Sequence, residues 1–261
     1  MDRLYCTYLS SVRQLEGIEL RQDVDAIQSA RGGASKDDSL PLVSLQNGSL
    51  GYDGSEPVLH GVDLTVYPGD LIGLAGPNGS GKTTLFRTIL GLLPILDGVL
   101  SRNCPLSNFG YVPQSAALDA QFPLSTAEVV EMGAYGRVRS YQVLPSEERE
   151  KTGEVLDQVG MRHLLAKSFF ALSGGQKQRI LIARALMVKP KIMILDEPLS
   201  GVDEDSRRSI TDLLINLTRK NGLAVFFSSH DLQMVQRVAD QIVRVDNGNI
   251  WVEERRTGGQ S

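Results

Sequence analysis

An eight-residue stretch in the first third of the chain constrains the fold more than any other feature of the sequence. It reads GPNGSGKT at 76–83 and matches the pattern G-x-x-x-x-G-K-[S/T]. The apolar run LIGLAG ends at the first glycine of this stretch, and Leu85 and Ile89 follow at helical spacing. A strand, a Gly-rich loop and a helix in this order turn backbone N–H groups and the positive end of a helix dipole toward a phosphate. We therefore expect an α/β protein with a nucleotide phosphate site.

The residue types in this loop suit a triphosphate and its magnesium ion. Glycines let the backbone wrap around phosphate oxygens, Lys82 is expected to reach the β- and γ-phosphates, and the Thr83 hydroxyl is expected to bind Mg²⁺. The alternative is a flexible Gly-rich loop before a helix, and the buried strand ahead of the loop disfavours it. The expected nucleotide contacts are Gly76, Pro77, Asn78, Gly79, Ser80, Gly81, Lys82, Thr83 and Thr84.

Two adjacent acids follow another apolar run. Asp196 comes directly after IMIL, at the end of the sheet where open α/β folds bind ligands, and Glu197 is next. Asp196 is expected to hold the metal through water, and Glu197 to polarise the attacking water as a general base. By itself an Asp-Glu pair after a strand is as often a solvated turn. Together with the phosphate loop, the pair predicts a magnesium-dependent hydrolytic site.

Strand signals recur along the rest of the chain. The apolar runs at 192–195 and 224–227 predict buried parallel strands, and the apolar–polar alternation at 62–66 predicts a half-buried strand. Asn247-Gly248, between IVRV and IWV, predicts a closing hairpin.

Helix signals separate these strands. The helix after the phosphate loop is expected to continue to Leu93 and to stop at Pro94. Apolar residues at 210–217 predict a second long helix that ends at Asn221-Gly222.

The middle of the chain, about 121–170, is predicted to be a helical insertion in the sheet. Ser125-x-x-Glu128 ahead of apolar residues fits a capping box, and another helix is expected to begin near Ser146. The fold class is therefore an α/β sheet interrupted by a helical segment.

Composition limits the cellular setting. The 27 Lys and Arg residues and 31 Asp and Glu residues give a formal net charge of -4, so basicity does not argue for nucleic acid. Cys6 and Cys104 are far apart in the sequence, which favours a reducing, cytosolic compartment. The densest apolar stretch, 85–96, is too interrupted to span a bilayer.

Residues 1–40 have little apolar periodicity and are expected to be a poorly ordered extension before an ordered domain at 41–261.

A five-residue motif, LSGGQ at 172–176, indicates the family. Ser173-x-x-Gln176 is a capping-box pattern, but this does not explain Gly174 and Gly175, since each glycine inside a helix costs roughly 1 kcal/mol. Paired glycines suit a backbone that approaches another group closely. With this motif, the chain resembles the ATP-binding subunits of ABC transporters over about 41–252. The resemblance implies a P-loop NTPase fold of the ABC type, with an antiparallel β subdomain and an α-helical insertion.

The resemblance assigns further roles to matching positions. Tyr52 resembles the residue that stacks on adenine, and Gln114 resembles the glutamine that touches Mg²⁺ and the attacking water. Asp203 resembles the residue that reaches across a dimer interface, and His230 the histidine that contacts the γ-phosphate and holds Glu197. A lone histidine is more often a capped or core residue, and a packed tyrosine at a strand end is nearly as common as one that stacks on a base. One departure is Leu199, where the family usually carries Thr.

The resemblance also implies the activity and its partners. Two copies would hold each ATP between one copy's phosphate loop and the other copy's LSGGQ, where Ser173, Gly174, Gly175 and Gln176 contact the nucleotide. Hydrolysis of ATP to ADP and phosphate would drive a membrane permease from the cytoplasmic side, together with an extracytoplasmic solute-binding protein and without nucleic acid.

The stretch after Gln114 bears on the transported solute. Asp119, Phe122-Pro123 and the run at 129–133 are similar to the zinc and manganese importer subfamily, so a divalent metal ion is the expected cargo. Iron-siderophore and cobalamin importers share a looser form of this stretch and remain an alternative. A soluble ABC ATPase that acts without a transporter is a second alternative.

Overall fold

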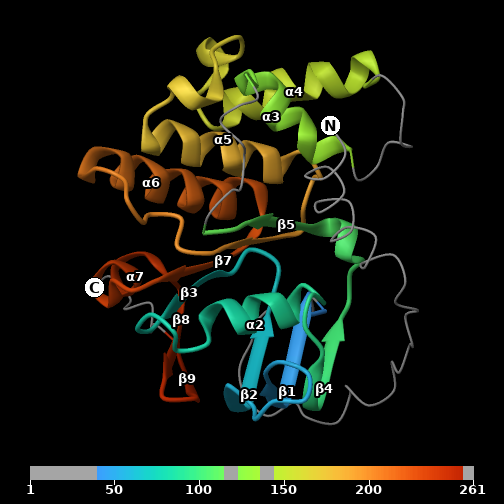
Figure 1. The fold of residues 1–261 in the computed structure, drawn as a ribbon, viewed down its shortest axis with the longest axis vertical. Coiled ribbons are helices and arrows are strands. Elements are labelled where there is room, and N and C mark those ends of the chain that lie inside the picture. Colours follow the sequence, from blue (N-terminus) through green and yellow to red (C-terminus); the bar gives the residue numbers. More distant parts are fainter. Residues whose placement is uncertain (1–39, 115–122, 136–143, 255–261) are drawn as a thin grey trace, which may run out of the picture.

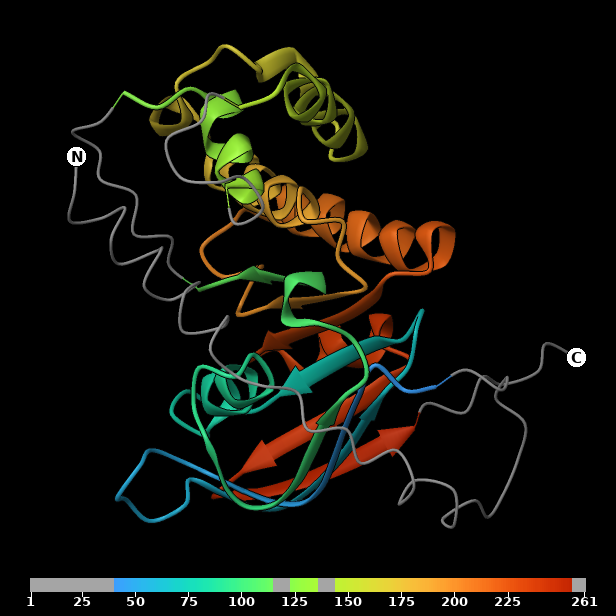
Figure 2. The ribbon, with the colours of Figure 1, turned by 90° about the vertical axis from the view of Figure 1, so that its right-hand side faces the viewer.

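The computed structural model describes residues 40–114, 123–135 and 144–254, and it places two sheets and a layer of helices on one another (Figure 1). The larger sheet has six strands in the order β5-β6-β7-β3-β8-β9, and the smaller sheet has the order β2-β1-β4. Helices α3, α4, α5 and α6 lie on one side of the larger sheet, and α2 and the smaller sheet lie on the other (Figures 1 and 2). The bounds are β1 Val43–Leu50, β2 Leu59–Val66, β3 Leu71–Ala75, α2 Lys82–Ile89, β4 Ile95–Arg102, β5 Phe109–Val112, α3 Thr126–Glu131, α4 Ser146–Gln158, α5 Gly174–Leu186, β6 Ile192–Leu195, α6 Glu204–Asn221, β7 Ala224–Ser229, α7 Leu232–Val238, β8 Gln241–Asp246 and β9 Asn249–Glu254.

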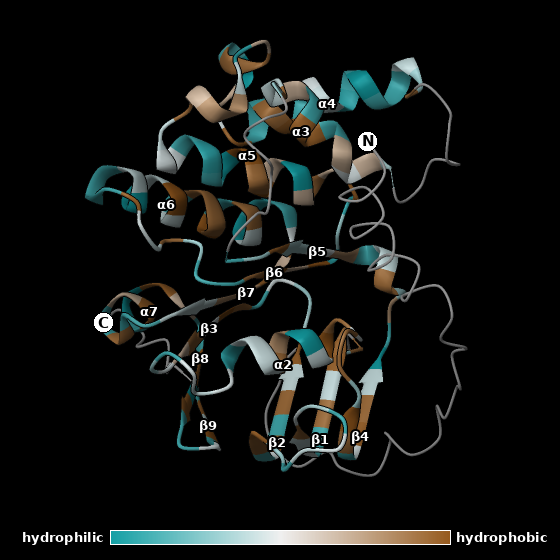
Figure 3. Ribbon diagram, in the orientation of Figure 1, coloured by the Kyte–Doolittle hydropathy of each residue, from teal (hydrophilic) through white to brown (hydrophobic). Residues whose placement is uncertain are grey.

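Both faces of the larger sheet are buried. In β7, Val225 and Phe227 point into the core under the helices, whereas Phe226 packs on the opposite side with Phe86 of α2. Strands β5, β6, β7, β3 and β8 are parallel, which explains why LIGLA of β3, IMIL of β6 and AVFF of β7 are continuous apolar runs that do not alternate. Figure 3 shows hydrophobic residues along the strands and a largely hydrophilic α4.

The predicted strands at 62–66, 192–195 and 224–227 are confirmed as β2, β6 and β7. The closing hairpin is also confirmed: β8 and β9 are antiparallel, and positive φ angles of 46° at Asn247 and 77° at Gly248 form the turn.

Residues 123–135 and 144–170 contain the two predicted helices, α3 and α4. Both halves of the capping box between Ser125 and Glu128 are present. Helix α4 begins at Ser146 and buries Val155 and Leu156, as expected from the sequence.

The predicted end of the helix after the phosphate loop is wrong. Helix α2 ends at Ile89, four residues before Leu93, because Gly91 adopts a φ of 72°. The N–H of Gly91 then donates to the Thr88 carbonyl and the N–H of Leu92 to the Arg87 carbonyl, the two bonds of a Schellman motif. The glycine therefore ends the helix before Pro94 can.

Within the part of the chain that the structure describes, no helix is long and apolar enough to cross a membrane.

Candidate functional site

The phosphate loop connects β3 to α2, as its sequence predicts. Gly81 has a φ of 110° and occupies the N-cap of α2, a conformation that a side chain would strain. The buried Lys82 ammonium folds back over the loop and donates to the Gly76 carbonyl at 2.8 Å and the Pro77 carbonyl at 3.0 Å. The Ser80 hydroxyl is buried and has no hydrogen-bond partner. The loop therefore offers a buried cation and an unmet polar group, which suits a phosphate ligand.

Asp196 lies at the carboxyl end of β6, where the hydroxyls of two other elements reach it. The Thr83 hydroxyl donates to Oδ2 at 2.7 Å, and the Ser228 hydroxyl donates to Oδ1 at 2.7 Å. Only 3% of Asp196 is exposed. A hydroxyl and a carboxylate oxygen are ligands that Mg²⁺ favours, so Thr83 and Asp196 fit the predicted metal role.

Glu197 is held in a strained and almost fully buried position. Its φ is 50°, which is unusual for a residue other than glycine, and its N–H donates to the Ser228 hydroxyl at 2.8 Å. The carboxylate Oε2 lies 3.0 Å from His230 Nδ1, and Oε1 forms an ion pair with Lys82 Nζ at 3.3 Å. Oε1 accepts no hydrogen bond. The backbone therefore aims one carboxylate at both the loop lysine and the histidine.

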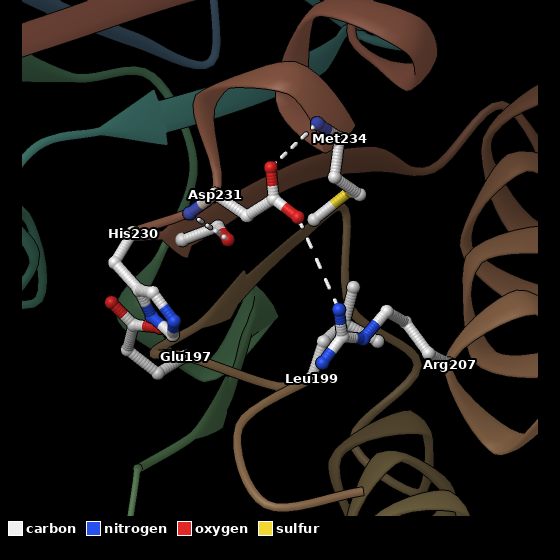
Figure 4. A pocket seen from close by; sticks show the side chains of 7 residues that line it. Glu197, Leu199, Arg207, His230, Asp231 and Met234 are labelled. Carbon is white, nitrogen blue, oxygen red and sulfur yellow. Dashed lines mark hydrogen bonds and ion pairs between the residues drawn. The ribbon is translucent and has the colours of Figure 1, made fainter. Parts of the chain in front are cut away.

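A small cavity of about 50 Å³ opens beside this carboxylate (Figure 4). Leu199, at the position where the resembling family usually has Thr, is buried and lines the cavity. The full lining is Glu197, Leu199, Arg207, Ser229, His230, Asp231 and Met234.

The LSGGQ motif begins α5, in the helical layer. Ser173 and Gln176 form both halves of the predicted capping box. A Cβ on Gly175 would lie 2.4 Å from Ser206 Cβ, so close packing of α5 on α6 requires this glycine. A Cβ on Gly174 would meet nothing nearer than the Gly201 carbonyl at 3.4 Å. Packing within one chain thus accounts for one glycine of the pair and leaves the other available to a ligand or partner.

The structure does not bring LSGGQ onto the phosphate loop of the same chain. The hydrogen bonds of Ser173 and Gln176 stay within the first turn of α5, and Gly174 and Gly175 face 201–206. In Figure 1, α5 and α2 lie on opposite sides of the larger sheet.

The other predicted site residues lie on loops after strands or before helices. Tyr52 is exposed after β1, and Gln114 is exposed after β5. Asp203 accepts hydrogen bonds from the Ser206 N–H at 2.9 Å and the Ser206 hydroxyl at 2.7 Å, which caps α6. The backbone bond first, and the hydroxyl bond second, lower the pKa of Asp203. Asp119 and Phe122 lie outside the described residues.

Sequence reasoning missed Ser228. This fully buried hydroxyl joins Asp196 to the backbone of Glu197 from the neighbouring strand, because Leu195 and Phe227 are paired in register. A signal was available, since two serines that continue the apolar run AVFF must find polar partners inside the sheet.

Comparison with known proteins shows the family of the chain. A family model described as ABC transporter matches residues 59–200, more than half of the 261 residues. The chain belongs to the ABC transporter family. It is an ATPase subunit of that family.

Two relatives of this ABC subunit carry the name zinc import ATP-binding protein ZnuC. The one from Pseudomonas aeruginosa (strain UCBPP-PA14) is 39% identical over 202 residues, covering 77% of this chain and 70% of that protein. The one from Yersinia pestis bv. Antiqua (strain Antiqua) is 39% identical over 202 residues, covering 77% of this chain and 75% of that protein.

Solved ABC structures share the fold. A metal-chelate type ABC transporter in an inward-facing conformation gives a TM-score of 0.76 at 28% identity, over 82% of this chain and 84% of that chain. A dimeric ATP-binding cassette, MJ0796, in a post-hydrolysis state with ADP and phosphate, gives a TM-score of 0.68 at 28% identity, over 82% of this chain and 99% of that chain. Cassettes of this family therefore bind nucleotide and form dimers.

Proposed function

We propose that this ABC subunit hydrolyses ATP to power the import of zinc through a membrane permease. The observation that carries the hydrolytic part is the position of Glu197, buried between Lys82 of the phosphate loop and His230 after β7. The zinc part is supported by the names of the relatives and by the stretch after Gln114.

Lys82 and Glu197 divide the work on the triphosphate. Lys82 exchanges the carboxylate of Glu197 for the β- and γ-phosphates when ATP binds, because the phosphates present more negative charge to it. Glu197, released from the lysine, accepts a proton from the water that attacks the γ-phosphorus, and the bridging oxygen leaves with ADP. His230 Nδ1, 3.0 Å from Oε2, holds the carboxylate in line for that proton transfer.

Thr83 and Asp196 would hold the magnesium ion, with Gln114 as a third ligand. When bound, the ion neutralises part of the charge on the phosphates. Ser228 keeps Asp196 in place through its bond to Oδ1. Tyr52, exposed near the end of β1, would stack on the adenine.

Two copies complete the site. LSGGQ does not lie on the phosphate loop of its own chain. In a dimer, therefore, one copy would contact the nucleotide of the other through Ser173, Gly174, Gly175 and Gln176. Asp203 would approach the same interface from the start of α6. A helical subdomain at about 121–170 within a 41–261 domain would transmit closure of the dimer to the permease on the cytoplasmic side.

Reconstitution tests this function and its alternatives together. The subunit would be purified with its native permease and solute-binding protein, placed in liposomes, and assayed for phosphate release and metal uptake. We expect ATPase activity to rise when the solute-binding protein carries zinc. Stimulation by manganese alone, by an iron-siderophore complex, or by nucleic acid in place of the permease would overturn the zinc assignment and identify the correct alternative.

A further inference from the structure

Arg207, near the start of α6, lies beside the hydrolytic site without a role in the proposed chemistry. Its guanidinium lines the cavity next to Glu197 and His230 (Figure 4). Nη1 lies 4.0 Å from Asp231 Oδ2 and 3.9 Å from Glu204 Oε2. One acid belongs to its own helix and the other to the loop of His230, so this arginine faces two elements at once.

Stability of the whole fold does not explain why Arg207 is placed here. Arg207 and Asp231 side chains are 38% and 42% exposed, and pairs of that kind contribute little to stability. The Nε of Arg207, in contrast, is buried and has no hydrogen-bond partner. Buried polar groups without partners are rare and often mark functional sites, because the rest of the fold must tolerate their lost hydration.

Asp231 makes two different contacts with its two oxygens. Oδ1 accepts from the Met234 N–H at 3.0 Å and caps α7, whereas Oδ2 faces Arg207. Its own N–H donates to the Ser229 hydroxyl at 3.1 Å. His230 is therefore flanked on both sides by residues whose positions are fixed, and one of the restraints comes from α6.

Chain connectivity and two side-chain contacts together link Arg207 to Glu197. The backbone runs from Glu197 past buried Leu199 to Asp203, the N-cap of α6, and Arg207 lies one turn further along that helix. Arg207 faces Asp231, and the neighbouring His230 returns to Glu197. A shift at the start of α6 would therefore move Asp231 through Arg207, and with it the imidazole of the neighbouring His230.

We propose that Arg207 is a positioning residue for ATP hydrolysis. Through Asp231 it holds the loop of His230 against the first turn of α6, and so keeps Nδ1 on the Glu197 carboxylate. This inference rests on the proposed hydrolytic function and adds to it a residue that touches neither nucleotide nor metal.

A double-mutant cycle tests it. Arg207→Gln removes the charge, and Asp231→Asn removes the charge while Asn keeps the cap of α7. In the reconstituted complex we expect each single variant to lower kcat about fivefold with KM for ATP within about twofold, and the double variant to fall no further. Arg207→Lys should recover part of the loss. Arg208→Gln is the matched control, since Arg208 is 73% exposed and pairs only with Glu204 in the described residues.

A second readout needs no nucleotide. The chain has three histidines, so the imidazole signal of His230 can be assigned by NMR through its loss in His230→Gln. It should move in Arg207→Gln and Asp231→Asn, and stay in place in Arg208→Gln.

Three results would overturn the inference: an unmoved His230 signal, additive losses in the double variant, or an equal loss in Arg208→Gln. If the wild-type complex releases no phosphate, the proposed function fails, and the NMR comparison still decides whether Arg207 positions His230. Circular dichroism of each variant separates these results from misfolding. If Arg207→Gln does not fold, Asp231→Asn with the His230 signal as its readout decides the test.

Discussion

Lys82 Nζ lies 3.3 Å from Glu197 Oε1, and both side chains are only 6% exposed. The lysine that is expected to bind the γ-phosphate is thus paired with the carboxylate that is expected to activate water. If both residues act as proposed, nucleotide binding has to break this ion pair. We therefore expect the pair to lower the affinity for ATP and to occupy the general base until the phosphates displace it.

Glu197→Gln should uncouple binding from hydrolysis. The amide cannot accept the proton of the attacking water, so we expect kcat to fall at least about a hundredfold. The neutral amide also competes less strongly for Lys82 than the carboxylate does, so the Kd for ATP should decrease, and nucleotide-bound dimers should accumulate. Equilibrium binding, phosphate release and size-exclusion chromatography measure these effects. Glu154→Gln, an exposed change on α4, is the control; weaker ATP binding by Glu197→Gln would contradict the competition between carboxylate and phosphate.

Ser228→Ala should damage both stability and metal binding. The substitution leaves Asp196 Oδ1 and the Glu197 N–H without the partner they share, and unmet buried groups cost about 2 kcal/mol. We expect the Mg²⁺ concentration for half-maximal ATPase activity to rise. Urea unfolding and a magnesium titration check the two effects. Unchanged stability would show that water replaces the hydroxyl.

Gly175→Ala and Gly174→Ala should separate packing from function. The new Cβ at Gly175 would lie 2.4 Å from Ser206 Cβ, and overpacking of this kind costs about 2 kcal/mol. A Cβ on Gly174 meets no atom closer than 3.4 Å, so Gly174→Ala should fold normally. Its ATPase activity should still fall, because the added methyl group would lie at the proposed interface between two copies. Thermal unfolding and ATPase assays distinguish them. Recovery of stability in Gly175→Ala with Ser206→Gly would identify Ser206 as the cause; equal unfolding of the two single variants would contradict the packing argument.

The cap of α6 should respond to acid. Bonds from the Ser206 N–H and hydroxyl lower the pKa of Asp203 below its ordinary value of 3.8. A lowered folded-state pKa means that the ionised carboxylate stabilises the fold above pH 3.8, and this contribution disappears as the pH falls through the lowered value. Asp203→Asn keeps a cap without the charge. The Tm difference between wild type and Asp203→Asn should therefore shrink in acid, and a difference independent of pH would exclude this role.

The strongest sequence signals predicted elements whose local chemistry agrees with the fold. The apolar runs of β6 and β7, the capping boxes at Ser125 and Ser173, and the Asn-Gly turn each specify their structure within a few residues. Strand β4 had no comparable signal, because it lies at the edge of the smaller sheet with no fully buried residue. The end of α2 was missed because a left-handed Gly91 ends a helix as well as a proline does.

The sequence by itself determined the family, the order of the motifs and the residue types of the site, since these depend on spacing along the chain. Only the tertiary structure decided how they meet: the left-handed φ of Glu197, its ion pair with Lys82, the hydroxyl of Ser228 between two strands, and the contact of Gly175 with Ser206. These contacts join residues from different elements, many of them far apart in the sequence. Their geometry follows from the register of parallel strands and the close packing of α5 on α6, which no local pattern encodes.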